Sequence, residues 1–181
     1  LRANMPPAVV RDLIIHPREN DLIVGTYGRA AWVTDISPLQ QMTPEIASKP
    51  LHLFAIEPKP QMNFSEQAMW GNYQMTGSNH LNTQNEPNGL EIWYYMSGTL
   101  KDDAVLTVRD ISGKQVFERK IKSKAGLQKT WWNTMRAEPG TYTLTVTCGS
   151  ITETVSGTVT EKWRWPVLNY NSESGVGIPG R

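Results

Sequence analysis

The sequence predicts an all-β protein, and three observations support this prediction. Apolar and polar residues alternate over several segments between residues 90 and 160, which is typical of strands with one buried and one solvent-facing side. Turn residues separate these segments at intervals of about ten residues. Helical periodicity is nearly absent, and the 14 Gly and 12 Pro residues of the 181-residue chain suit a fold with many turns.

The first part of the chain predicts a meander of three strands. Residues 9–16, 21–26 and 30–34 are apolar runs, and residues 17–20 form a turn-rich linker between the first two. Gly28 separates the second and third runs, where a tight hairpin turn needs a positive φ angle that glycine adopts without steric cost. Three strands alone bury little surface. We therefore expect residues 9–34 to pack on the rest of the chain or on a second copy of it.

Residues 36–60 contain five prolines and predict a connector. Short helices are expected at residues 36–41 and 44–48, where Ser37-Pro38 and Thr43-Pro44 provide N-cap and first-turn residues. One strand is expected at residues 51–56. Residues 61–89 are rich in Asn, Gln, Gly and Met without a clear period, which predicts a long irregular excursion.

Regular alternation then predicts strands at residues 90–96, 104–109, 115–121, 127–135, 141–148 and 151–160. With residues 51–56 these make about seven strands, the number in an immunoglobulin- or fibronectin-like β-sandwich. The predicted organisation has three parts. Residues 1–50 form the meander and the Pro-rich connector, residues 51–162 form the sandwich, and residues 163–181 form an aromatic and then Gly-rich tail.

Residues 11–29 read Arg-Asp-Leu-Ile-Ile-His-Pro-Arg-Glu-Asn-Asp-Leu-Ile-Val-Gly-Thr-Tyr-Gly-Arg. This stretch resembles the last blade of the sortilin-type and sialidase-repeat-type β-propellers of large secreted bacterial proteins. Tyr27 stands where that family usually has His, and Thr34-Asp35 replaces an acidic pair. The resemblance implies a three-stranded propeller-blade-like meander in a secreted, glycosyl-hydrolase-like parent protein. It also implies a periplasmic or extracellular location.

A second resemblance lies in the predicted sandwich. Residues 105–116, the pair Trp131-Trp132 and residues 139–146 are similar to the small immunoglobulin-like modules of flagellar hook-capping type. Those modules occur near the C-termini of secreted bacterial proteins and are structural, or act in secretion and anchoring. The resemblance therefore implies an accessory module.

Composition excludes several partners. The formal net charge is +1 with scattered basic residues, whereas nucleic-acid binding needs a concentrated basic surface. The longest apolar runs, such as residues 22–24 and 30–33, are too short to span a bilayer. A single cysteine, Cys148, cannot form an internal disulfide, so cysteine usage does not indicate the redox compartment.

The sequence predicts no catalytic, metal or cofactor site. His16, His52 and His80 are far apart and lack a second ligand at metal-binding spacing. Cys148 shares the predicted buried side of its strand and is expected to act as a small hydrophobic residue. Asp102 and Asp103 are adjacent in a predicted turn, where aspartate is common.

Aromatic residues provide the candidate binding site, because exposed rings on one side of a sheet can stack on the apolar faces of sugars. Trp131 and Trp132 are adjacent in the sequence, so one of them must point away from the core. The alternative is that the rings cover the sandwich or hold the tail. The residues predicted to stack on sugar are Trp93, Tyr95, Trp132, Trp163 and Trp165.

These observations predict a non-catalytic accessory module that caps or positions the propeller of its parent protein. The expected partners are the rest of that propeller and, through residues 9–34, a second copy of the chain. Two alternatives stay open. One is a carbohydrate-binding module that uses exposed tryptophans, and the other is a fragment of a glycoside hydrolase whose catalytic blades lie upstream.

Overall fold

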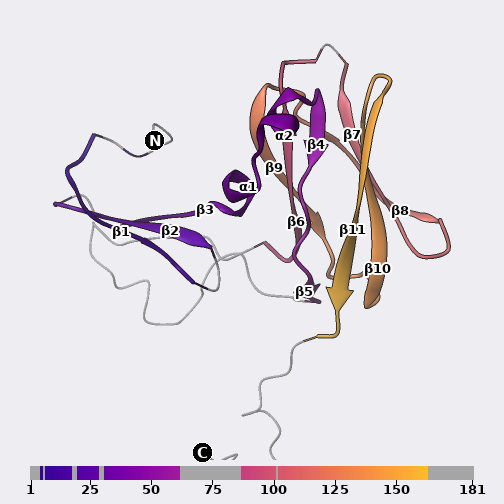
Figure 1. Cartoon of the computed structure of the whole chain (residues 1–181). Helices are drawn as coiled ribbons and strands as arrows, with labels where there is room; N and C mark the ends of the chain where they lie inside the picture. Colours follow the sequence, from indigo (N-terminus) through magenta and orange to yellow (C-terminus); the bar gives the residue numbers. More distant parts are fainter. Residues whose placement is uncertain are drawn as a thin grey trace, which may run out of the picture. The chain divides into compact units, whose positions relative to one another are not determined.

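The computed structural model describes residues 5, 7–17, 20–28, 31–61, 87–100 and 102–162. Backbone contacts divide the chain into two compact units, residues 1–49 and 50–181. The predicted all-β class is confirmed, because the described residues form mainly antiparallel sheets with two short helices (Figure 1). The elements are β1 (Val10–Ile15), β2 (Asp21–Thr26), β3 (Ala31–Asp35), α1 (Ser37–Gln40), α2 (Pro44–Ser48), β4 (Leu51–Leu53), β5 (Lys59–Pro60), β6 (Gly89–Met96), β7 (Ala104–Arg109), β8 (Gln115–Ile121), β9 (Gly126–Asn133), β10 (Gly140–Cys148) and β11 (Ile151–Thr160).

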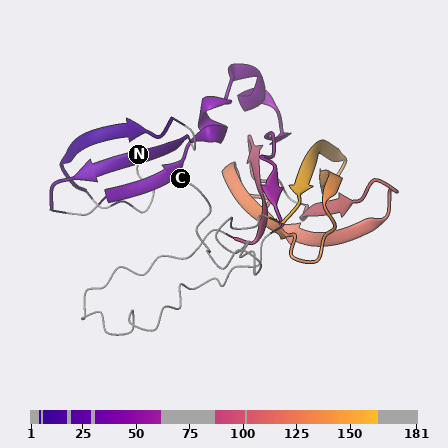
Figure 2. The same cartoon turned by 90° about the horizontal axis from the view of Figure 1, so that it is seen from below.

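The first unit contains the predicted three-stranded meander. β1, β2 and β3 lie side by side in that order and pair antiparallel (Figure 2). Gly28 lies in the turn between β2 and β3 with a φ of +71°, as the sequence predicts. This conformation is one that residues with a Cβ rarely adopt.

Both faces of this sheet carry apolar side chains. Residues directly opposite each other on paired strands point to the same side of a sheet. The register therefore defines two faces. The first, called the Leu13 face, holds Leu13, Ile15, Leu22, Val24 and Trp32. The second, called the Ile14 face, holds Ile14, Ile23 and Val33.

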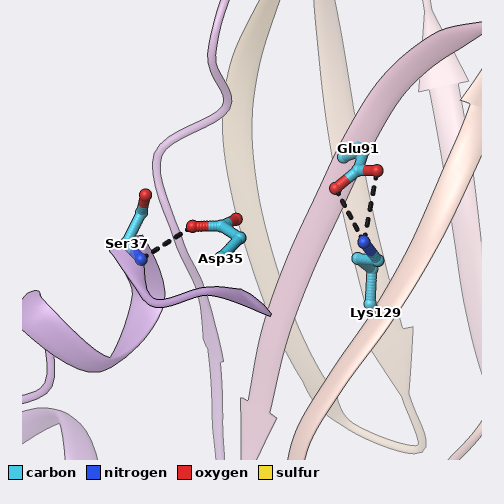
Figure 3. Close-up of polar contacts among 4 residues, drawn as sticks. All are labelled: Asp35, Ser37, Glu91 and Lys129. Atoms are coloured by element: carbon cyan, nitrogen blue, oxygen red, sulfur yellow. Dashed lines mark hydrogen bonds and ion pairs between the residues drawn. The ribbon is translucent and has the colours of Figure 1, made fainter. Parts of the chain in front are cut away.

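The two short helices follow the sheet. The Oδ1 atom of Asp35 accepts a hydrogen bond of 2.8 Å from the backbone N–H of Ser37 at the start of α1 (Figure 3). The expected N-cap at Ser37 is wrong: the N-cap residue is Ile36, and Asp35 provides the side-chain acceptor. The expected cap of α2 is confirmed, because Thr43 Oγ1 accepts a bond of 3.3 Å from the backbone N–H of Ile46.

The second unit consists of two sheets that share one core (Figure 1). One sheet has the strand order β5-β11-β10-β7-β8 and the other has the order β4-β6-β9. A Cβ atom placed on Gly157 of β11 would lie 2.7 Å from Leu144 of β10 and 2.9 Å from Leu90 of β6. Side chains from both sheets therefore meet at this glycine, where the sandwich has no room for another methyl group.

The core follows the predicted alternation. The inward residues of β6, β7 and β10 are buried, and every second residue between them is more exposed. The expected strand over residues 51–56 is shorter than predicted, because β4 ends at Leu53. The chain then crosses to the other sheet, where Lys59 and Pro60 form β5 parallel to the end of β11. Within the described residues, no helix is long and apolar enough to cross a membrane.

Candidate binding face

The outer face of the β4-β6-β9 sheet carries two of the five aromatic residues that the sequence singled out, Trp93 and Tyr95. The inward residues of β6 are Leu90, Ile92, Tyr94 and Met96, all fully buried. Strand alternation then places Trp93 and Tyr95 on the outer side. Both are partly buried, and they share this side with Glu91.

β9 adds a second row to the same face. Its pairing with β6 places Trp131 opposite Glu91, and Lys129 opposite Trp93. These four side chains form a square. The indoles of Trp93 and Trp131 occupy one diagonal, and the charged groups of Glu91 and Lys129 occupy the other. We call this square the Trp93–Trp131 face.

The two charged residues of the square form an ion pair. The Nζ atom of Lys129 donates to both carboxylate oxygens of Glu91, over 3.2 and 3.0 Å (Figure 3). The same ammonium group lies 5.1 Å from the ring centroid of Trp93, within the range of a cation–π interaction. Lys129 therefore satisfies the charge of Glu91 and packs on one indole at the same time.

The second indole is held by an arginine from the other sheet. The guanidinium carbon of Arg119 in β8 lies 5.5 Å from the ring centroid of Trp131 and 5.6 Å from that of Phe117. Trp131 is still 44% exposed. A planar guanidinium stacked on a ring keeps its N–H groups available at its edge. The contact with Trp131 therefore leaves the N–H groups of Arg119 able to donate hydrogen bonds.

Trp132 lies on the opposite side of β9 from Trp131. It is 4% exposed, and its ring packs edge-to-face on Tyr142 with the centroids 4.7 Å apart. An enclosed ring offers no face to a sugar, so Trp131 is the member of the pair that a ligand can reach. Sequence reasoning missed Trp131, although it required that one of the two rings point outward. Trp163 and Trp165, with the predicted tail, lie outside the described residues.

A hollow of about 680 Å³ lies at one end of the sandwich and is lined in part by Trp132, Tyr142 and Asp110. Asp110 is occupied by the turn between β7 and β8. Its Oδ1 accepts bonds from the hydroxyl and N–H of Ser112 and from the N–H of Lys114. The bond from the Ser112 side chain is the main cause of the lowered pKa of Asp110. This carboxylate organises a hairpin turn, as a turn aspartate commonly does.

The candidate reactive groups are dispersed. Cys148 is 2% exposed, its Sγ donates to the carbonyl oxygen of Asp102 over 3.2 Å, and burial raises its pKa, which suppresses the reactive thiolate. Asp103 forms an exposed ion pair of 2.7 Å with Lys120, and the hydrogen bond from Lys120 lowers the pKa of that carboxyl. In the part of the chain that the structure describes, no three His, Cys, Asp or Glu residues are grouped to hold a metal ion. His80 lies outside that part.

Comparison with known proteins gives no assignment for this architecture. No protein-family model matches the chain, and no curated protein sequence matches it. The function of the chain is therefore inferred from its three described sheets and their exposed surfaces.

Proposed function

We propose that this chain is a non-catalytic accessory module of a propeller-containing protein, in which β1–β3 is a blade-like layer covered on both faces. The observation that supports this is the exposure of aliphatic side chains on both sides of that sheet. Leu13 of the Leu13 face is 57% exposed, and Ile14 and Val33 of the Ile14 face are 54% and 62% exposed.

A sheet with two apolar faces is suited to a position between two other sheets, where neither face contacts solvent. Antiparallel sheets of soluble proteins usually have one apolar face and one wet face, whereas a propeller blade has neighbouring blades on both sides. Contiguous exposed apolar surface marks interaction sites. The chemistry of both faces therefore supports a neighbouring sheet on each side of β1–β3.

The larger unit supports an immunoglobulin-like accessory role in this proposal. Tyr142, at the start of β10, donates its hydroxyl hydrogen to the carbonyl oxygen of Glu138 over 2.7 Å. A tyrosine at the start of a strand that bonds back to the backbone a few residues upstream is a hallmark of immunoglobulin-type sandwiches. Such a sandwich, with its polar outer strands and its dispersed reactive groups, suits positioning better than catalysis.

The test uses the full chain alone, where the blade-like sheet lacks the neighbours we propose. A symmetric dimer formed through one face leaves the other face uncovered, so the chain is expected to form assemblies larger than a dimer. Leu13→Lys and Ile14→Lys substitute adjacent residues on opposite faces. In sedimentation velocity, each single variant should stop at a dimer and the double variant should be a monomer.

Thr152→Lys, on an exposed position of β11, is the matched control for the added charge and should assemble like the original chain. A wild-type chain that stays monomeric at all concentrations contradicts the proposal. A double variant that associates as the wild type does would equally contradict it.

A further inference from the structure

We propose that Trp131 and Arg119 form a binding site for an acidic polysaccharide, one whose sugars carry carboxylate groups. This site lies on the sandwich and does not depend on the role proposed for β1–β3. The ligand class follows from two side chains with complementary chemistry: an exposed indole and a guanidinium group stacked on it.

Trp131 provides the apolar contact. It is 44% exposed and belongs to β9, an edge strand of its sheet. The cation–π contact with Arg119 restricts its orientation, so little conformational freedom is lost when a ring stacks on it. A sugar ring has an apolar face of C–H groups that suits such stacking.

Arg119 provides the charge preference. The two neighbouring lysines have carboxylate partners, since Lys120 pairs with Asp103 and Lys129 pairs with Glu91. Among the described residues, no carboxylate lies within ion-pair distance of Arg119. Its guanidinium group lies over two aromatic rings, those of Phe117 and Trp131. An arginine in this state can bind a carboxylate through two parallel hydrogen bonds.

The surroundings favour a sugar over two other kinds of partner. An apolar protein surface seated here would bury the ion pair between Lys129 and Glu91, and the desolvation of such a pair is costly. A nucleic acid would require many cations to neutralise its phosphates. On this face, the ammonium group of Lys129 is already paired with the carboxylate of Glu91. The hydroxyl groups of a sugar can instead hydrogen-bond to the exposed atoms of Lys129 and Glu91, so that this ion pair stays solvated.

The experiment is affinity electrophoresis of the full chain in gels that contain one polymer each. Polygalacturonate and alginate are the acidic polysaccharides, galactomannan is the neutral one, and poly-L-glutamate carries carboxylates without sugar rings. The wild type should be retarded by an acidic polysaccharide, and less by the other two polymers. Added salt should weaken the retardation, because salt screens exposed charges.

Variants separate stacking from charge. Trp131→Ala and Arg119→Gln should each weaken binding by about tenfold, and Trp131→Phe should retain part of it. Lys120→Gln removes a charge from the adjacent position of β8 and is the matched control, with binding unchanged. Circular dichroism of each variant checks that the fold is intact.

Three results would overturn the proposal. The first is the absence of retardation by both acidic polysaccharides. The second is equal binding to poly-L-glutamate, which would reduce the site to charge alone. The third is an equal loss for Lys120→Gln and Arg119→Gln. None of these results affects the assembly test of β1–β3, because that test measures association through different residues.

Discussion

The hydroxyl group of Tyr142 and the carbonyl oxygen of Glu138 are joined by a hydrogen bond of 2.7 Å across four residues of the chain. The bond connects the turn that precedes β10 to the first buried side chain of that strand. The ring of Tyr142 also packs on Trp132 of β9. This tyrosine therefore ties the connection between β9 and β10 to the core of the sandwich.

Tyr142→Phe should lower the free energy of unfolding of the sandwich by about 1 kcal/mol, because one hydrogen bond is lost and the ring packing is kept. Urea denaturation followed by circular dichroism measures the change. Tyr27→Phe is the control, since Tyr27 is 71% exposed and should give no change. An unchanged midpoint for Tyr142→Phe would contradict the structural role of this bond.

Gly89→Ala should destabilise the sandwich by more than about 2 kcal/mol. Gly89 has a φ of +152°, and a Cβ atom there would collide with the carbonyl oxygen of Trp132 on the neighbouring strand. Gly98→Ala is the matched control, because a Cβ atom at Gly98 meets nothing within 4 Å. Thermal unfolding of the two variants compares them directly. Equal unfolding temperatures would show that the close approach at Gly89 is absent.

High pH should destabilise the sandwich through Tyr94. Burial raises the pKa of Tyr94 from 10.0 to about 12, against a smaller opposite effect of the hydrogen bond to Lys122. The phenol of Tyr94 ionises at a lower pH in the unfolded chain than in the folded one. The contribution of Tyr94 to stability is therefore complete below about pH 10 and is lost as the pH rises towards about 12. Urea midpoints at several pH values across this range should fall.

Tyr94→Phe should make that fall shallower, because phenylalanine has no proton to lose. Tyr27→Phe should leave the fall unchanged. A wild-type midpoint that stays constant over the same range would contradict the burial of the Tyr94 hydroxyl.

Period-two alternation was sufficient to predict the strands of the sandwich from β6 to β11. The inward set of β10, namely Tyr142, Leu144, Val146 and Cys148, is buried as the sequence indicates. The prediction succeeds there because threonines occupy the other side, so that the apolar side of the strand is easily recognised as the one that faces the core. Alternation does not show which of Trp131 and Trp132 points inward, because two identical neighbours fit either assignment of the two sides of the strand. Their orientation is set by the register with β6, which places Trp132 opposite buried Leu90.

The connector shows a second limit of sequence reasoning. β5 consists only of Lys59 and Pro60, and it pairs with β11 about a hundred residues later. No local pattern of two residues can indicate such a pairing. The ion pair between Glu91 and Lys129 and the stacking of Arg119 on Trp131 likewise join residues that are distant in the sequence. The candidate site could therefore be predicted as exposed aromatics on a strand, but its charged partners could not.

We propose that both faces of β1–β3 are covered in the assembled protein, and hydrogen exchange of the full chain at several protein concentrations measures whether they are. Amides of β1–β3 should become better protected as the concentration rises, while those of β10 should be protected at every concentration. Leu13→Lys combined with Ile14→Lys should remove this concentration dependence. A monomeric chain in which β1–β3 is as well protected as β10 at the lowest concentration would contradict the claim.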